Sequence, residues 1–299
     1  MSTKFKTADG YDADVTRACE TALVVLLRAF GSLRHTLRLV GGLVPRYLTP
    51  EQPPDIPVHA GTTDVDVVLN VSVLAERGTY DKLRRQLKDN GFMPYETEQG
   101  KVSKWQWVYE LKGLPVVIEF LLDAGDPSRS GKLVEVDGED VSALQILHAS
   151  IAHEWFEERE VRVELPDGDG VVTEVVRYAD AVAFLVLKTL AFDQRSTRKD
   201  VADLIHVMRH WRTVDELAEL YAQRLRTSAH SDALRDVLGL LEKHFCDDDR
   251  DEGWTKDGPS MFANFHQVGQ PGGDAFVLEQ RDVSGMVMDF VGKVRALCE

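Results

Sequence analysis

The chain has 299 residues, of which 43% are hydrophobic and 28% are charged, a balance typical of a globular protein that can bury a core. Its formal net charge of −15 excludes a protein coated in basic surface for nonspecific nucleic-acid binding, although it leaves room for a local basic groove. Three widely spaced cysteines give no zinc signature and no apolar run reaches membrane-spanning length, so we expect a cytoplasmic protein without a membrane partner.

The first predicted helix covers 11–30, because its apolar residues recur at helical spacing and Gly31 follows them. Gly41 and Gly42 then lead into a short predicted helix over 43–48. Adjacent glycines let a backbone approach a phosphate closely, and a helix N-terminus offers N–H donors to it. An ordinary tight turn would explain the same two glycines. No Walker A or G-x-G-x-x-G sequence occurs, which removes the main support for P-loop and Rossmann folds.

An Asp-Val-Asp sequence inside an apolar run is the most informative motif of the chain. It follows a proline-rich loop over 49–59 and reads Gly61-Thr62-Thr63-Asp64-Val65-Asp66-Val67-Val68-Leu69. Because side chains alternate along a strand, Asp64 and Asp66 should share one face. Two carboxylates on a buried strand need compensation, and bound Mg²⁺, or Mn²⁺ in its place, would supply it. The alternative is a strand-end turn with solvated acids, but the following Val-Val-Leu favours burial.

A later strand carries a third candidate ligand. The run 114–122 is apolar except for Glu119, and it follows a predicted strand over 104–110 and a hairpin turn. Side by side, the two acid-bearing strands would build a site for two metals roughly 3.5–4 Å apart, a geometry suited to nucleotidyl transfer. Between them, a charged helix is predicted over 73–91, whose basic residues fit either a solvated face or a polynucleotide contact.

The second half of the chain is predicted to be mainly helical. One helix starts near 178 and carries Lys188 in an apolar run, where a lysine could snorkel from the core or bind phosphate. A basic turn with Arg198 and Lys199 precedes a helix opened by Asp200. That acid could cap the helix and form a salt bridge to Lys188 or Arg198, or it could orient one of these cations against a nucleotide.

Further helices are predicted from 214 onward, with a loop over 260–273 and a closing helix over 283–297. None of these segments shows a catalytic constellation. The sequence therefore predicts an α/β (α+β) fold, with a mixed sheet and flanking helices in a catalytic domain over 1–176. A mainly helical domain over 177–299 would follow it.

The order of these motifs resembles the DNA polymerase β-like nucleotidyltransferase superfamily, and within it the AbiEii/MenT type of nucleotidyltransferase toxin. The motifs that carry the resemblance are Gly41-Gly42, Asp64-x-Asp66, Glu119, the helical Lys188 and the run Arg198-Lys199-Asp200-Val-Ala-Asp203-Leu204. They cover roughly 37–208.

The resemblance implies a nucleotidyltransferase-type sheet and the transfer of a nucleoside monophosphate from an NTP. Asp64, Asp66 and Glu119 would hold metal, with Lys188 and Asp200 as further catalytic residues. The implied nucleotide contacts are Gly41, Gly42, Arg46, Thr63, Lys188, Arg198 and Lys199. The acceptor would be a tRNA 3′ end, in a type IV-like toxin–antitoxin or phage-defence system with a separate antitoxin.

Two alternatives stay open at this point. The acceptor could be a protein or a small hydroxyl compound, which suits an acidic chain as well as RNA does. The chain could also be a catalytically silent nucleotide-binding scaffold or an antitoxin, but the intact Asp-x-Asp argues against that role.

Overall fold

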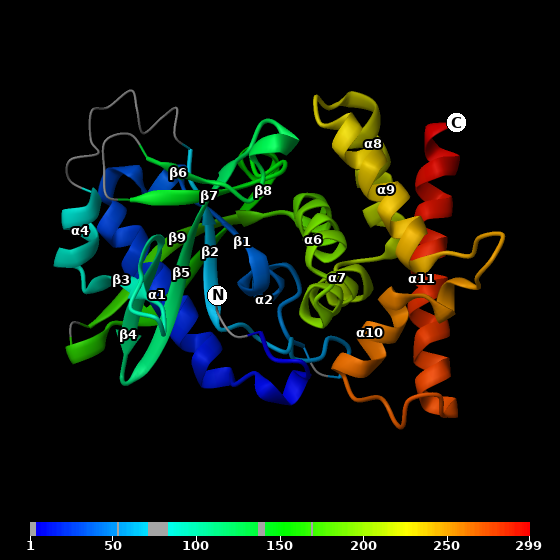
Figure 1. Ribbon diagram of the computed structural model, residues 1–299, viewed down its shortest axis with the longest axis horizontal. Helices are drawn as coiled ribbons and strands as arrows, with labels where there is room; N and C mark the ends of the chain where they lie inside the picture. The colour runs from blue at the N-terminus through cyan, green and yellow to red at the C-terminus, as the bar shows by residue number, and fades with distance from the viewer. Residues whose placement is uncertain (1–3, 53, 71–82, 137–140, 169) are drawn as a thin grey trace. The chain divides into compact units, whose positions relative to one another are not determined.

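The computed structural model describes residues 4–52, 54–70, 83–136, 141–168 and 170–299. These residues form two compact units, and neither unit is one continuous stretch of chain (Figure 1). Unit 1 comprises Tyr11–Tyr47 and Gly61–Asp180, and unit 2 comprises Lys4–Gly10, Leu48–Ala60 and Ala181–Glu299. The proline-rich segment Leu48–Ala60 therefore interrupts unit 1 in sequence but belongs to unit 2.

Unit 1 is built on a mixed sheet. The described strands are β1 (Arg38–Val40), β2 (Asp64–Val68), β3 (Phe92–Glu96), β4 (Val102–Leu111), β5 (Leu114–Asp123), β6 (Leu133–Glu135), β7 (Ser142–Ile146), β8 (Phe156–Glu164) and β9 (Val171–Ala179). They follow the order β3-β4-β5-β2-β1-β9-β8, and β7 joins β5 to β6. The pairs β2–β5, β1–β9 and β5–β7 are parallel and the others antiparallel, which confirms the predicted mixed sheet.

The helices of unit 1 are short except for the first. They are α1 (Ala13–Phe30), α2 (Pro45–Leu48), α4 (Leu83–Asp89) and α5 (Ile151–Glu154), with 3-10 turns at Gly31–Thr36, Gly41–Leu43, Pro127–Arg129 and Pro166–Gly168. Most of the helix predicted over 73–91 lies outside the described residues, and α4 is its described part. The hairpin turn predicted between β4 and β5 is present, with positive φ at Lys112 and Gly113.

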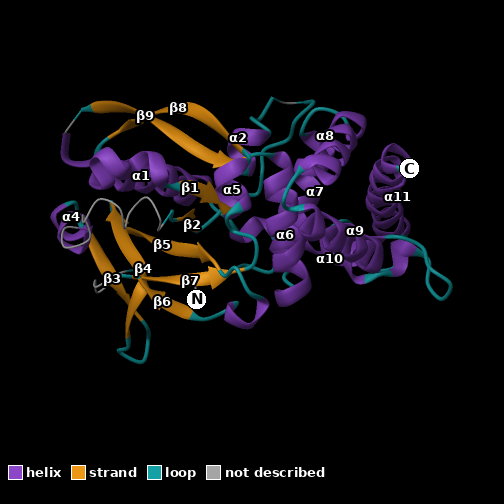
Figure 2. Ribbon diagram, turned by 90° about the horizontal axis from the view of Figure 1, so that it is seen from above, coloured by secondary structure: helices purple, strands orange, loops and turns teal. Residues whose placement is uncertain are grey.

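Helix α1 covers the sheet because one of its faces is continuously apolar (Figure 2). Its start is fixed by Asp12, whose side chain accepts a hydrogen bond from the Asp14 N–H, as expected of an N-cap residue. Its end is fixed by Gly31, which takes a φ of 53° that glycine adopts without strain. The buried side chains include Ala22, Leu26 and Phe30, at the spacing that the sequence predicted.

Unit 2 is helical, as predicted. Its helices are α6 (Ala181–Arg195), α7 (Arg198–His210), α8 (Val214–Thr227), α9 (Ser231–Phe245), α10 (Asp257–Phe265) and α11 (Asp274–Cys298), with 3-10 turns at Ala8–Gly10 and Gly253–Thr255. Helix α11 packs against α8, α9 and α10. Among the described helices of both units, none is long and apolar enough to cross a membrane.

The loop predicted over 260–273 was wrong in its first half, because α10 extends to Phe265. The first turn of α10 contains Gly258 and Pro259, and proline is tolerated there because the backbone N–H that it lacks would have no partner within the helix. Phe262 and Phe265 are buried at a spacing of three residues, and their burial stabilises the helix.

Helices α6, α9 and α10 are joined by one buried histidine. The His244 ring has Nε2 2.9 Å from Asp193 Oδ1 on α6 and Nδ1 2.8 Å from Asp257 Oδ1 on α10. Both ring nitrogens thus lie within hydrogen-bond distance of a carboxylate, so one side chain links three helices. The Phe192 ring packs against the imidazole with a centroid distance of 4.7 Å.

Replacing His244 with glutamine should lower the free energy of unfolding by about 2 kcal/mol, because two charge-assisted hydrogen bonds are lost. Lys243→Gln is the control, since Lys243 also contacts Asp193 but its side chain is 60% exposed, so a change below about 1 kcal/mol is expected. Urea denaturation at pH 7 measures both. Equal effects of the two variants would contradict this account.

Candidate functional site

The three predicted metal ligands lie on two adjacent parallel strands of unit 1. Asp66 on β2 is directly aligned with Glu119 on β5, and Asp64 lies two residues before Asp66. Aligned residues of neighbouring strands, and residues two apart on one strand, point to the same face of a sheet. The backbone therefore brings all three carboxylates to one face. Asp64 is buried, while Asp66 and Glu119 are half-buried and accessible to a small ligand.

Two neutral side chains hold these carboxylates in place. The Thr62 hydroxyl donates to Asp64 Oδ1 at 2.8 Å, and the Gln106 amide donates from Nε2 to Glu119 Oε1 at 2.8 Å. Gln106 lies on β4 in register with Glu119 and is itself buried. The sequence analysis missed Gln106, because only the strand register shows that it faces an acid.

Gly41 is the point where the backbone meets the acidic face. It has a φ of 74°, and a Cβ built on it would lie 1.8 Å from Asp66 Oδ2. Any side chain here would displace the Asp66 carboxylate, so the glycine is required by this contact as well as by its backbone conformation. Gly42 follows in the same buried 3-10 turn. The turn that the sequence predicted for phosphate binding therefore lies directly beside a predicted metal ligand.

The carboxylates of β2 help to raise the pKa of a thiol on the neighbouring helix α1. Burial raises the pKa of the Cys19 thiol on α1, and the charges of Asp64 and Asp66 raise it further. A thiol in this position stays protonated and acts as a small apolar group.

The two remaining predicted contacts of unit 1 lie nearby in sequence. Arg46 pairs with Glu20, with Nε 3.2 Å from Oε1, and Thr63 is half-buried just before β2.

A metal at these carboxylates would need further donors from a substrate or from water. In the described part of the chain, no three acidic, histidine or cysteine side chains converge closely enough to hold a metal ion by themselves. Mg²⁺ is commonly bound by only one or two carboxylates together with substrate phosphates and water. The aligned pair Asp66 and Glu119, with Asp64 beside it, supplies such an oxygen donor set.

Unit 2 contains a second, separate group of buried charges around Lys188. Its ammonium lies 3.1 Å from Asp200 Oδ1 and 2.7 Å from Asp203 Oδ2, and all three residues are buried. The salt bridge that the sequence analysis considered for Asp200 is therefore present, and it involves both acids of α7. Lys188 is thus buried and uses two of its three N–H donors on these acids.

Further cations surround the same two acids. Asp200 also binds Arg195 Nη2 at 3.0 Å, and the Lys199 ammonium binds Asp203. Burial alone would raise the pKa of both carboxyls, but the ammonium of Lys188 and the other cations hold each pKa below its usual value. Arg195 was missed as a partner of Asp200, because the sequence alone did not distinguish it from Arg198. The predicted contact Arg198 is half-buried at the start of α7.

The segment Leu48–Ala60 supplies a histidine to this group. His59 Nε2 lies 2.7 Å from Asp203 Oδ1, and the His59 ring contacts the His206 ring at a centroid distance of 4.9 Å. His206 Nε2 lies 3.0 Å from the Thr49 hydroxyl oxygen. Burial, together with the charge of Lys199, lowers the pKa of His59 to about 4, and burial next to the rings of His59 and His210 lowers that of His206 to about 3. These histidines are therefore neutral at pH 7.

Comparisons with known proteins add little to this description. No protein-family model and no curated protein matches the chain. Among solved structures, the crystal structure of JHP933 from Helicobacter pylori aligns with a TM-score of 0.40 and 12% identity, over 96% of this chain and 95% of that one. A likeness at this level carries no argument about fold or function.

Gly41→Ala should lower the free energy of unfolding by about 3 kcal/mol or more, because the added methyl group collides with Asp66 in a strained backbone conformation. Gly125→Ala is the matched control. Gly125 also has a positive φ, 63°, but nothing lies within 4 Å of its Cβ position, so a loss of only about 1 kcal/mol is expected. Chemical denaturation of both variants separates the collision from the backbone strain, and equal losses would show that no collision occurs.

The buried histidines should make unit 2 sensitive to acid. Since the folded-state pKa of His59, about 4, lies below its ordinary value of 6.5, the unfolded chain binds more protons between these values, and stability falls as the pH falls through this range. A shift of this size corresponds to about 3 kcal/mol for His59 alone. Unfolding free energies measured from pH 7 to pH 4 should fall less steeply in His59→Gln than in the parent chain. A parental slope in His59→Gln would refute the assignment.

Proposed function

We propose that this chain is a Mg²⁺-dependent nucleotidyltransferase that transfers a nucleoside monophosphate from an NTP to an acceptor hydroxyl and releases pyrophosphate. The observation that carries the proposal is the alignment of Asp66 with Glu119 on parallel strands, with Asp64 on the same face. Three carboxylates on one face of a sheet repel one another, and a bound divalent cation would relieve this repulsion.

Each residue of the acidic face has a proposed role. Mg²⁺ held by Asp66 and Glu119 together with the triphosphate, with Asp64 beside them as the third predicted ligand, would neutralise the charge of the triphosphate and of the leaving pyrophosphate. Glu119 would also accept the proton of the acceptor hydroxyl, and the Gln106 amide orients it by binding one of its oxygens. The missing side chain at Gly41 would let backbone N–H groups approach the phosphates next to Asp66.

The acceptor and the cellular role rest on the resemblance to nucleotidyltransferase toxins. We propose a tRNA 3′ end as acceptor and a toxin function that a separate antitoxin controls. In unit 2, Lys188 binds Asp200 and Asp203, and we assign it the role of positioning these acids. Arg198 and Lys199 remain proposed contacts of the nucleotide. In the structure, Lys199 is buried and its ammonium binds Asp203.

A transfer assay tests the reaction. The protein is incubated with each α-labelled NTP, Mg²⁺ and total RNA, and label on small RNA is measured with and without a chelator. Asp66→Asn and Glu119→Gln preserve shape and remove charge, and each should lower the transfer rate by about 100-fold or more. Glu110→Gln, at an exposed acid of β4, should retain the parental rate.

The other outcomes distinguish the alternatives. Label on the protein itself would indicate protein modification in place of RNA modification. Transfer that persists in Asp66→Asn would contradict the assigned site. No transfer, together with no Mg²⁺-dependent NTP binding by calorimetry, would favour the catalytically silent scaffold.

A further inference from the structure

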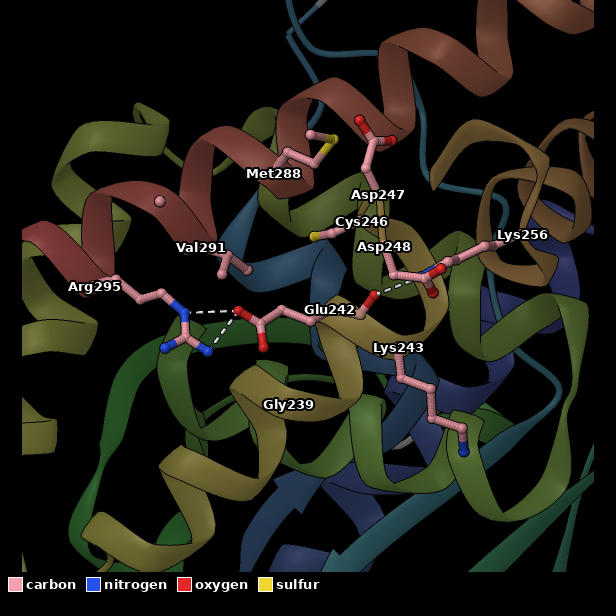
Figure 3. A pocket seen from close by; sticks show the side chains of 11 residues that line it. Gly239, Glu242, Lys243, Cys246, Asp247, Asp248, Lys256, Met288, Val291 and Arg295 are labelled. Atoms are coloured by element: carbon pink, nitrogen blue, oxygen red, sulfur yellow. Dashed lines mark hydrogen bonds and ion pairs between the residues drawn. The ribbon is translucent and has the colours of Figure 1, made fainter. Parts of the chain in front are cut away.

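A pocket of about 460 Å³ lies in unit 2 between α9 and α11 (Figure 3). Its lining combines uncharged residues of α9 and α11, and Cys246 directly after α9, with charged groups of both signs. We call the uncharged residues the floor and the charged residues the rim. The floor residues are Gly239, Cys246, Met288, Val291 and Gly292, and the charged residues are Glu242, Lys243, Asp247, Asp248, Lys256 and Arg295. Cavities of this size commonly hold ligands or inserted side chains of a partner.

Two glycines keep the pocket open at a cost to the helices. Gly239 lies within α9 and Gly292 within α11, and nothing lies within 4 Å of the Cβ position of either residue. Glycine destabilises a helix interior relative to alanine, and no close packing requires it at these two positions. Both glycines are exposed and line the pocket, so a larger side chain at either position would take up space beside it.

The floor between them suits an apolar group. Val291 is buried, whereas Met288 is 36% exposed and its flexible thioether can adjust to different shapes. Burial raises the pKa of Cys246 to about 11, so its thiol is neutral here and adds to the apolar floor. Apolar residues next to charged ones, with exposed methionine and arginine, are the composition of a protein–protein contact.

The charges of the rim select the sign of the partner. The pairs Arg295–Glu242 at 2.6 Å and Lys256–Asp248 at 2.8 Å flank the floor on opposite sides (Figure 3). Lys243 is paired with Asp193 at 2.6 Å. Each of these three cations is thus paired with an acid. The loop over 247–252, which borders the pocket, adds further exposed acids. These acids are Asp247, Asp249, Asp251 and Glu252, against the single base Arg250.

We propose that this pocket is a docking site for a basic amphipathic helix of a partner protein. The helix inserts one large apolar side chain between Gly239 and Gly292 and sets its lysine or arginine residues against the acidic loop 247–252. The walls of the pocket are the surfaces of two packed helices, and a third helix fits such a groove through its i, i+3 and i+4 side chains. The site is independent of the proposed transfer reaction.

Fluorescence anisotropy with defined helical peptides tests the site on the full chain. The probe is an 18-residue amphipathic peptide with a leucine stripe and lysines on its flanks, and the comparison peptide carries glutamates in place of the lysines. Gly292→Leu should weaken binding of the basic peptide about tenfold or more, because it fills the pocket. Gly285→Leu is the matched control on the same helix, at an exposed position with open space that does not line the pocket, and it should leave the affinity unchanged.

The charge requirement is tested separately. Asp247→Asn keeps an oxygen that can accept the Gly253 N–H, and together with Asp249→Asn it should weaken only the basic peptide, about threefold or more. The proposal is overturned if the basic peptide does not bind, if Gly292→Leu binds it as well as Gly285→Leu does, or if the acidic peptide binds equally. It is also overturned if sedimentation shows that Gly292→Leu dissolves a self-association, since the surface would then bind a second copy of the chain.

Discussion

The parallel pairing of β2 with β5 is the interaction on which unit 1 depends. It places a strand with two acids inside the sheet, hydrogen-bonded along both edges and followed by buried valines. A strand in that position can carry charge only if its neighbours are adapted to it. Three adaptations are visible: a hydroxyl from Thr62, an amide from Gln106 and the missing side chain of Gly41. A change in the register of β2 and β5 would therefore also change the arrangement of the carboxylates.

Unit 2 accommodates buried acids in a different way. Asp200 and Asp203 are surrounded by ammonium and guanidinium groups, which compensate their charge directly. Removing one member of such a group is costly, because the remaining charges stay buried without it. In unit 1, Asp64 and Glu119 instead accept hydrogen bonds from the neutral side chains of Thr62 and Gln106.

Local sequence patterns predicted the parts of the site that depend on local geometry. Strand alternation placed Asp64 and Asp66 on one face, and helical spacing placed Asp200 and Asp203 together. The patterns did not reveal Gln106 or His59, because each meets its acid through strand register or through the packing of a distant segment. Helix α10 was missed in part for a related reason: Gly258 and Pro259 resemble a loop locally, and only burial of the following phenylalanines makes the helix stable.

The segment Leu48–Ala60 limits how this protein can be divided. It is encoded between the glycine turn and the Asp-x-Asp strand, yet His59 and Thr49 make their hydrogen bonds within unit 2. Neither unit can therefore be moved to another protein as one continuous stretch of gene. A gene truncated after codon 180 would still encode this segment but not Asp203 or His206, its binding partners. If recombination replaced the helical half of the gene, the new half would have to provide a surface that fits the segment Leu48–Ala60, which the other half encodes. The two halves are therefore constrained to evolve together.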